Sequence, residues 1–338
     1  MSRVGLLIAG LLIASTRVAL ADGTLEGVRA AGSLDCGVTI ESEDYSKSEA
    51  HGDLSVLGLD VCRSVAAVVL GDAAMLTPLV LPDDTKSLAA VASGKIALLA
   101  GGTPDLADEA AYRVVFGPPV FLDGQGFLVR KGTGLAAIKD LEGKQVCYIS
   151  ETRAEDDLID GLARRGVHVM PFPFEETGEM EAALVTGHCA TIAASVSQLA
   201  EMRTGFHART SAYEIMPETI SLLPFAPVCR SDDPQWAAIV AWTVHALVLA
   251  EEAGVTRANA AALRDGGRPA VRYLLGGVPG VGKALGLDDG WAFRAIAAVG
   301  NYGEMFDRDL GSQSPLRIAR GRNTLWSEGG GICAPSVR

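Results

Sequence analysis

The stretch LLGGVPGVGKALGL, residues 274–287, contains the residues most suggestive of chemistry. Gly277, Gly282 and Lys283 fit the phosphate-loop pattern G-x-x-x-x-G-K. That pattern ends in Ser or Thr, whose hydroxyl binds the magnesium ion of a nucleotide, whereas this chain has Ala284. A phosphate loop also follows a strand, and the residues before Gly277 have a helical pattern. We therefore predict a glycine-rich turn between two helices.

Other motifs for catalysis or metal binding are missing from the sequence. It contains no G-x-S-x-G elbow, no H-E-x-x-H motif and no C-x-x-C pair, and its five histidines are scattered singly. We therefore expect no metal, no cofactor and no enzyme activity.

Residues 1–21 have the build of a secretory signal peptide. Arg3 precedes an apolar run over residues 4–14, and Ala-Leu-Ala at positions 19–21 predicts cleavage after Ala21. The apolar run is about 11 residues long, whereas a membrane-spanning helix needs roughly 20. We expect an exported, periplasmic protein.

The chain is acidic, and this limits its partners. Its formal net charge is −12, and loss of Arg3 and Arg17 with the signal peptide makes it −14. Nucleic-acid binding draws most of its affinity from clustered Lys and Arg, so we expect none. We expect a monomer.

Strand-like and helical patterns alternate along the mature chain, as in α/β proteins. LDCGVTI and KIALLAG are predicted as strands, with the helix VCRSVAAVVLG between them. After residue 126 the pattern recurs, with predicted strands in IKDLEGKQVCYIS, VHVMPFPF and ATIAAS and predicted helices in RAEDDLIDGLARRG and GEMEAALVTGHC. A mature chain of about 317 residues usually forms two domains, so we predict two lobes. From Pro234 onward the pattern is mainly helical.

Several phrases resemble the periplasmic general L-amino-acid-binding proteins of ABC importers, the family 3 solute-binding proteins. They are LDCGV, CRSVAAVVLGDA, DGQGFLVRK, DLEGKQVCY, ISLLPFAPVCRSDDPQWAAIVAWTVHALVLAEEAGVT, VGNYGEMFDRDLG and ARGRNTLWSEGG. The resemblance covers nearly the whole mature chain. It implies a periplasmic-binding-protein-like type II fold, in which two α/β lobes joined by two crossing strands close on a ligand, with a helical C-terminal extension.

The resemblance also implies a division of the chain. Residues 22–124 would begin lobe one, residues 125–227 would form lobe two, and residues 228–338 would return to lobe one and form the extension. DGQGFLVR and LPFAPVCR would be the two crossings.

The resemblance pairs four of the six cysteines within the lobes. It pairs Cys36 on the first strand with Cys62 on the first helix, and Cys147 with Cys189 on strands of lobe two. Cys229 and Cys333 remain, and a third bridge between them is an open alternative.

In lobe one, the positions that hold an amino acid in the family carry other residues here. The family's Thr-rich loop and arginine correspond to Thr103 and Glu109, and Asp105 precedes Glu109. Upstream, Tyr45 stands at an aromatic position of the family, and Leu54 replaces its tryptophan. Gly58 replaces an aspartate, unless the alignment slides by two residues to Asp60.

Lobe two departs from the family in the same way. The Gly-Thr-Thr helix start corresponds to Thr152, flanked by Glu151 and Arg153. The aspartate that receives the ligand ammonium group corresponds to Ser195.

Three interpretations of these substitutions remain open. The cleft has been rebuilt, with acids in lobe one and Arg153 in lobe two, for a solute that is not an ordinary α-amino acid. Alternatively, the acids are a solvated first helical turn and the site has lost its ligand. A shifted alignment that recruits Arg113 would restore an ordinary site.

The resemblance therefore predicts a periplasmic solute-binding protein that clamps a small polar solute and delivers it to an ABC transporter permease in the inner membrane. The alternative is an accessory or sensor protein on the same fold, without a small ligand.

Overall fold

A computed structural model describes residues 23–39 and 54–337. The expected signal peptide and Tyr45 lie outside these ranges. The strands are β1 (Leu34–Thr39), β2 (Leu76–Leu81), β3 (Leu98–Gly102), β4 (Val114–Phe116), β5 (Phe121–Asp123), β6 (Gln125–Arg130), β7 (Gln145–Ile149), β8 (Met170–Phe174), β9 (Thr191–Ser195), β10 (Tyr213–Ile215) and β11 (Leu223–Arg230).

The α-helices are α1 (Thr24–Ala31), α3 (Leu54–Leu70), α4 (Asp84–Ala92), α5 (Leu106–Tyr112), α6 (Arg153–Ala163), α7 (Thr177–Thr186), α8 (Val196–Gly205), α9 (Pro234–Glu252), α10 (Ala260–Gly266), α11 (Pro269–Leu274), α12 (Trp291–Val299) and α13 (Tyr302–Asp309). The 3₁₀ helices are η1 (Ile138–Leu141), η2 (His207–Ala212), η3 (Lys283–Leu285), η4 (Gly321–Asn323) and η5 (Trp326–Glu328). Within the described ranges, none of the helices has the length and apolar character that crossing a membrane requires.

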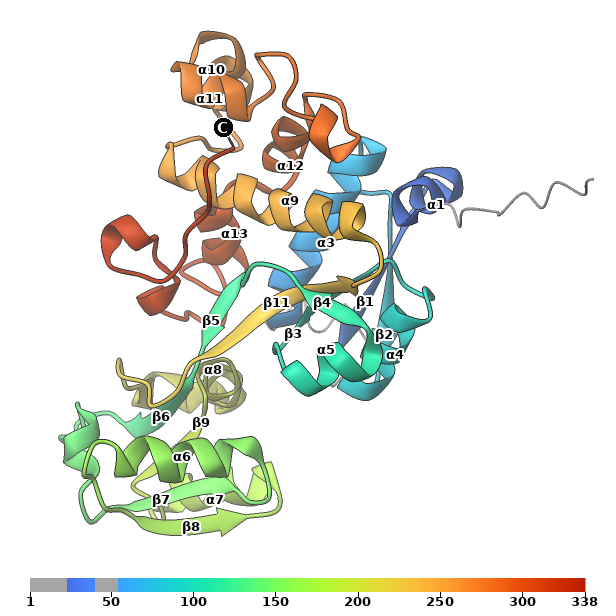
Figure 1. Ribbon diagram of the computed structural model, residues 1–338. Coiled ribbons are helices and arrows are strands. Elements are labelled where there is room, and N and C mark those ends of the chain that lie inside the picture. The colour runs from blue at the N-terminus through green and yellow to red at the C-terminus, as the bar shows by residue number, and fades with distance from the viewer. Residues whose placement is uncertain (1–22, 40–53, 338) are drawn as a thin grey trace, which may run out of the picture.

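The first sheet has the strand order β2-β1-β3-β11-β4, with β5 paired to β11 (Figure 1). Strands β1, β2 and β3 run parallel, and β11 is antiparallel to its neighbours. Helix α3 is buried along most of its length against β1 and β3. We call this sheet and its helices lobe one.

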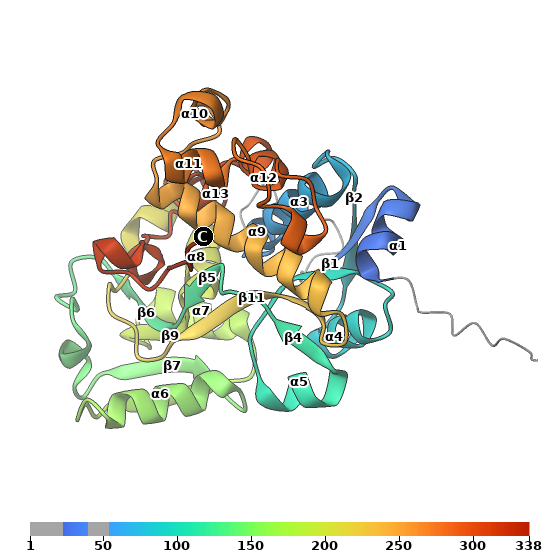
Figure 2. The ribbon, with the colours of Figure 1, turned by 45° about the horizontal axis from the view of Figure 1, so that its top comes forward.

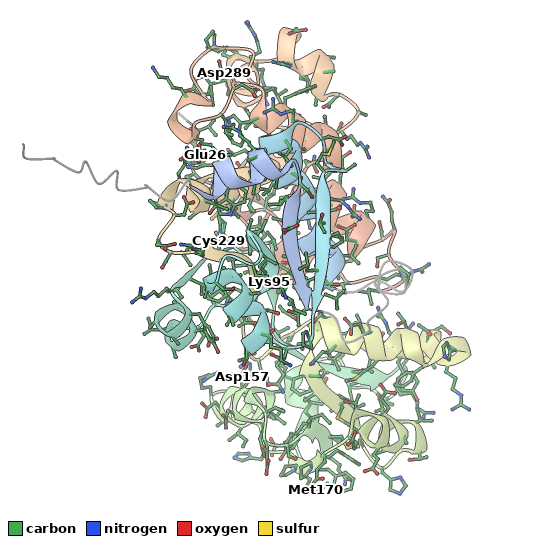
Figure 3. All side chains as sticks on the ribbon, turned by 90° about the vertical axis from the view of Figure 1, so that its right-hand side faces the viewer. Glu26, Lys95, Asp157, Met170, Cys229 and Asp289 are labelled. Atoms are coloured by element: carbon green, nitrogen blue, oxygen red, sulfur yellow. A yellow bond between two sulfur atoms is a disulfide. The ribbon has the colours of Figure 1, made fainter. Side chains whose placement is uncertain are left out.

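The second sheet, of lobe two, has the order β10-β6-β9-β7-β8. Successive side chains of β6 point to opposite faces. Phe127 and Val129 pack with Leu158 of α6, whereas Leu128 packs with Leu199 of α8. Strand β8 is the outer edge, and Met170 lies at the end of lobe two farthest from lobe one (Figure 3). Prolines within the sequence MPFPF remove N–H donors from this edge, which discourages pairing with another chain.

The chain passes between the sheets twice. Strand β5 ends in the first sheet at Asp123 and β6 begins in the second at Gln125, and the chain returns between β10 and β11. A Cβ atom on Gly124 would collide with the carbonyl oxygen of Ser221, so the two passages touch. The two α/β lobes joined by crossing segments confirm the predicted fold class. Division of the chain at residues 124–125 and 227–228 remains our proposal.

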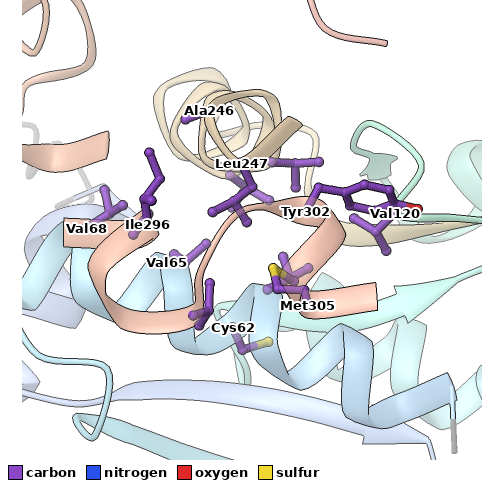
Figure 4. Close-up of a cluster of buried hydrophobic side chains, with 14 of the residues drawn as sticks. Cys62, Val65, Val68, Val120, Ala246, Leu247, Ile296, Tyr302 and Met305 are labelled. Atoms are coloured by element: carbon purple, nitrogen blue, oxygen red, sulfur yellow. The ribbon is translucent and has the colours of Figure 1, made fainter. Parts of the chain in front are cut away.

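The helices after β11 cover lobe one and form the predicted helical extension. Helices α9, α12 and α13 pack on α3 through side chains such as Val65, Leu247, Ile296 and Met305 (Figure 4). The extension also reaches the first passage, because the buried amide of Asn323 binds both backbone groups of Leu122, at 2.7 and 3.2 Å.

The glycine-rich stretch is the predicted turn and not a phosphate loop. It connects α11 to η3 and follows a helix. The backbone N–H groups of Gly280 and Gly282 donate to Oδ1 of Asp289, at 2.9 and 3.0 Å. A carboxylate of the chain thus occupies amides that a phosphate would need.

Two disulfides join the predicted pairs. Cys36 on β1 is bonded to Cys62 on α3, and Cys147 on β7 is bonded to Cys189. The expectation that Cys189 lies on a strand is wrong, because it belongs to the turn between α7 and β9. Each bridge lies within one lobe, so neither restricts the passages between the lobes.

The third bridge considered for the remaining cysteines is absent. Cys229 is a buried thiol on β11, and Cys333 is an exposed thiol in the extension. Burial, reinforced by the charge of Asp233, raises the pKa of Cys229 to about 12. Because the thiolate is the reactive form, Cys229 is expected to be inert in the folded protein.

We predict that a thiol reagent such as DTNB modifies one cysteine of the folded mature protein and two after unfolding without reductant. Cys333→Ser should abolish the reaction of the folded protein, and Cys229→Ser should leave it unchanged. Two fast thiols in the folded protein, or none after unfolding, would contradict the assignment.

An ion cluster with two buried carboxylates, Asp60 and Asp309, joins α3 to α13. Asp60 accepts a hydrogen bond from Nη1 of Arg63 at 2.7 Å and pairs with Nη2 of Arg308. Arg308 Nε donates to Oδ1 of Asp309 at 3.0 Å. Burial, and next the Asp60 charge, raise the pKa of Asp309 to about 8, although Arg308 lowers it.

The raised pKa makes stability depend on pH. Between the unfolded value of about 3.9 and the folded value, the folded protein retains a proton on Asp309 that the unfolded chain has lost. The free energy of unfolding should therefore fall as pH rises through this window, by up to about 1.4 kcal/mol per pH unit.

We predict that Asp309→Asn, which keeps a neutral donor at this position, flattens the fall in Tm between pH 6 and pH 9. The exposed Asp265→Asn serves as the control and should follow the wild type. Parallel curves for wild type and Asp309→Asn would show that Asp309 is already ionised in the folded protein.

Candidate functional site

The candidate site lies where three strands lead into helices. Strands β3, β7 and β9 are followed by the N-terminal ends of α5, α6 and α8. In α/β folds, ligands bind at the carboxyl ends of the strands. Figures 1 and 2 show α5 on the side of lobe one that faces lobe two. We call residues 103–109, 150–153 and 195 the interlobe face.

In lobe one, the acidic stretch begins a helix. Asp105 is the N-cap of α5, and its Oδ1 accepts hydrogen bonds from the N–H groups of Ala107 (2.8 Å) and Asp108 (3.3 Å). This is the ordinary role of an aspartate at a helix start. Glu109 is half-buried, makes no side-chain hydrogen bond with the described residues, and lies one turn beyond Asp105, whereas Thr103 is exposed before the helix.

Arg113 lies at the other end of the same helix. It is the C-cap of α5 in a left-handed conformation, with φ of 54°. Its carbonyl oxygen accepts hydrogen bonds from the backbone and hydroxyl of Ser231, at 3.0 and 2.9 Å. The structure therefore separates Arg113 from Asp105 by the length of α5.

In lobe two, the loop before α6 is held by a carboxylate. Glu155 accepts hydrogen bonds from the hydroxyl of Tyr148 (3.1 Å) and from the N–H of Glu151 (2.9 Å). Glu151 has φ of 58°, a conformation that is costly for residues other than glycine. Thr152 is exposed at the N-cap and donates to the carbonyl of Ile149 at 2.9 Å, and Arg153 begins the helix.

Ser195 ends β9 and caps α8. Its hydroxyl accepts from the N–H of Gln198 at 3.3 Å and lies 3.0 Å from Oγ of Ser197. Ser197 Oγ in turn donates to Oδ2 of Asp123 at 2.5 Å. Burial raises the pKa of Asp123, although its hydrogen bonds oppose this. Ser195 is thereby connected to the first passage between the lobes.

One residue of this region escaped the sequence analysis. Gln125 is directly opposite Ser195 in the β6–β9 ladder, at the carboxyl end of β9. It is 1 % exposed, and neither atom of its amide has a hydrogen-bond partner among the described residues. An unpaired buried amide costs about 1–3 kcal/mol. The sequence signal that could have revealed Gln125 is its polar amide directly before the apolar run GFLV, residues 126–129.

Other groups do not form a site near these residues. Asp60, considered under the shifted alignment, is paired with Arg63 and Arg308 in the ion cluster between α3 and α13. Within residues 23–39 and 54–337, no three His, Cys, Asp or Glu side chains are arranged to hold a metal ion.

Two α/β lobes joined by two crossing segments, with helices beginning at the strand ends, are the architecture of the type II solute-binding proteins. No family model matches the sequence. The chain is 36% identical over 319 residues to the general L-amino acid-binding periplasmic protein AapJ of Rhizobium johnstonii, covering 93% of each. It is 34% identical over 320 residues to the glutamate/glutamine/aspartate/asparagine-binding protein BztA of Rhodobacter capsulatus, with the same coverage.

A solved structure supports the same assignment. An ABC transporter periplasmic binding protein from Brucella ovis, with glutathione bound, is 32% identical, with a TM-score of 0.75. The alignment covers 94% of this chain and 99% of that one. The chain therefore belongs to the periplasmic amino-acid-binding proteins of ABC transporters, as the resemblance predicted. These relatives are named as solute-binding proteins and not as enzymes, sensors or accessory proteins.

We predict that Gln125→Met stabilises the ligand-free protein by about 1–3 kcal/mol, because it removes the unpaired amide at nearly constant volume. Urea unfolding measures the change. The half-buried Gln145→Met, on β7 of the same sheet, should change stability by less than about 0.5 kcal/mol. A loss above 1 kcal/mol for Gln125→Met would show that the amide is already paired.

Proposed function

We propose that the protein is the soluble receptor of an amino-acid-type ABC importer, exported with residues 1–21 removed, monomeric and without catalytic activity. Membership of the family over nearly the whole chain supports this role. The two lobes would close on a solute held at the interlobe face, and an inner-membrane permease would recognise the closed form. Ligand binding would then shift a pre-existing equilibrium between open and closed lobes.

For the ligand, we infer an amino-acid derivative and not a plain α-amino acid. The observation that carries this inference is the charge of lobe one at the interlobe face. Segment 98–112, from β3 through α5, contains no Lys or Arg but has three acids, Asp105, Asp108 and Glu109. A buried ligand carboxylate must be paired with a cation or with hydrogen-bond donors, whereas the acids of lobe one would repel it.

The arrangement fits a zwitterion bound with its ammonium group toward lobe one. Capping engages Oδ1 of Asp105, which leaves two half-buried acids, Asp108 and Glu109. We assign the ligand cation to Glu109 because it stands at the position of the family's arginine. The carboxylate would face lobe two, where the 11-residue helix α6 begins with Arg153 after Thr152. Helix starts favour anions. The first turn of α6 also carries Asp156 and Glu155, and the Glu155 carboxylate is engaged by Tyr148 and by the N–H of Glu151. Tyr45, Thr103, Ser195 and Gln125 would complete the wall.

Glutathione is the first compound to test. Its glycine carboxylate is well separated from its ammonium group, so it can place the ammonium at the acids of lobe one and this carboxylate at the helix start of lobe two. The other carboxylate, on the same carbon as the ammonium group, must then point away from Glu109. The Brucella ovis relative has it bound. Lobe two carries Glu151 next to Thr152, so the position of the second carboxylate must avoid that side chain.

We predict that calorimetry with the mature protein detects no low-micromolar binding of glutamate, glutamine or leucine, because position 109 is an acid. Glutathione and related γ-glutamyl peptides should bind. Micromolar binding of ordinary amino acids would overturn the ligand assignment. Absence of binding across peptides, polyamines, betaines and organic acids would overturn the receptor role.

Variants at the interlobe face test where glutathione binds. Glu109→Gln should weaken this binding about tenfold, equivalent to roughly 1.4 kcal/mol. The matched control Glu179→Gln, an exposed acid in the first turn of α7, should have no effect. Glu109→Arg combined with Ser195→Asp should restore some affinity for amino acids. Unchanged peptide binding in Glu109→Gln would remove Glu109 from the site.

A further inference from the structure

A cavity of about 480 Å³ lies beside the first passage between the lobes. We call it the hinge cavity. Its walls come from three parts of the chain. They are the passage at residues 121–124, lobe two including residues 215–219, and the extension at residues 317–323. Figure 2 shows the red C-terminal segment close to β5 and α8.

Arginines from two of these parts meet at the hinge cavity. Arg165 and Arg203 belong to lobe two, and Arg317, Arg320 and Arg322 belong to the extension. Five of the chain's 29 Lys and Arg residues thus line one cavity of an acidic protein. Positive charges gathered in one place repel each other and so destabilise the folded state, which makes their clustering here notable.

Three of these arginines already have partners in the chain. Arg320 pairs with Glu251 at 3.0 Å and lies over the ring of Tyr302. Arg165 donates to the carbonyl oxygens of Gly161 and Thr219, at 2.9 and 3.0 Å. Arg203 donates to the carbonyl of Leu316. Carbonyl groups orient a guanidinium but do not neutralise its charge.

The other two arginines have no acceptor among the described residues. The side chains of Arg317 and Arg322 are exposed and make no hydrogen bond or ion pair with the described residues. Burial, and next the charge of Arg317, lower the pKa of Arg203, so the arginines from the two sides repel each other. An anion between them would relieve this repulsion.

The cavity wall has two acids, Asp123 and Glu218, against five arginines. Asp123 is 7 % exposed and is engaged by Ser197 and by the N–H of Gly124. Glu218 accepts a hydrogen bond from the N–H of Ile138, in lobe two, at 3.3 Å. The wall therefore retains a net positive charge.

We propose that the hinge cavity binds a small oxyanion, a phosphate or a carboxylate group, between Arg203 of lobe two and Arg317 and Arg322 of the extension. Guanidinium groups bind such anions through paired N–H donors, more strongly than neutral donors do. The volume suffices for a small anion with its water. This site is separate from the interlobe face and uses none of its residues.

Binding at this site would be linked to the opening of the lobes. The extension packs on lobe one, whereas Arg165 and Arg203 belong to lobe two. An anion that contacts both sides stabilises the lobe arrangement that brings them together. By linkage, the solute at the interlobe face and the anion must then change each other's affinity by the same factor.

The test is calorimetric titration of the mature protein with inorganic phosphate, and separately with succinate, at constant ionic strength in chloride. We expect saturable binding of one anion per chain, and the stronger of the two probes identifies the anionic group. Arg317→Gln with Arg322→Gln should weaken binding at least tenfold. Arg164→Gln with Arg272→Gln, which removes the same charge from exposed positions outside the cavity, should leave it unchanged.

Absence of saturable binding of both probes would overturn the proposal, and so would equal weakening in the two double variants. Should Arg317→Gln with Arg322→Gln not fold, Arg322→Gln alone makes the same comparison with Arg272→Gln. Glutathione binding is measured in parallel. Its retention in the double variant keeps the two sites distinct, and its loss with unaltered folding would place the solute in the hinge cavity and overturn a separate anion site.

Discussion

The passage of the chain past Gly124 constrains the rest of the structure. At this point the two connecting segments touch, so position 124 has no room for a side chain. The buried carboxylate of Asp123, at the end of β5, is hydrogen-bonded to Ser197 in the first turn of α8. One lobe is thereby attached to the other at the pivot. Ser195 and Gln125 lie within two residues of these groups, and this places them at the edge where the lobes meet.

Much of the fold could be predicted because strands of parallel sheets are buried on both faces and therefore form apolar runs. Strand β9, TIAAS, and strand β7, QVCYI, are examples. The predictions fail where the local sequence has only a weak preference for the structure that forms. Strand β10 has three residues, β2 contains Pro78 and is half-exposed, and Ile138–Leu141, predicted within a strand, forms the 3₁₀ helix η1. Tertiary pairing decides such segments more than propensity does.

The site could be predicted only to the level of positions. An aspartate at a helix start is a local signal, so the capping role of Asp105 was foreseeable. The partner of Asp60 was not, because Arg308 lies 248 residues further along the chain. The unpaired amide of Gln125 is also a property of the folded protein, since an absent partner leaves no pattern in the sequence.

The proposed closure of the lobes on a solute would connect these observations. In the proposed site, a zwitterion would contact Glu109 of lobe one and the start of α6 in lobe two, and it would gain both contacts only when the lobes approach. The hinge cavity borders the same pivot, and its arginines also belong to both sides. Repulsion between Arg203 and Arg317 acts against any arrangement that brings them together, whereas an anion reverses the sign of that contribution. The charge at the pivot would therefore determine how much of the solute's binding free energy is used to close the lobes. The coupling free energy between two linked sites is typically about 1–3 kcal/mol.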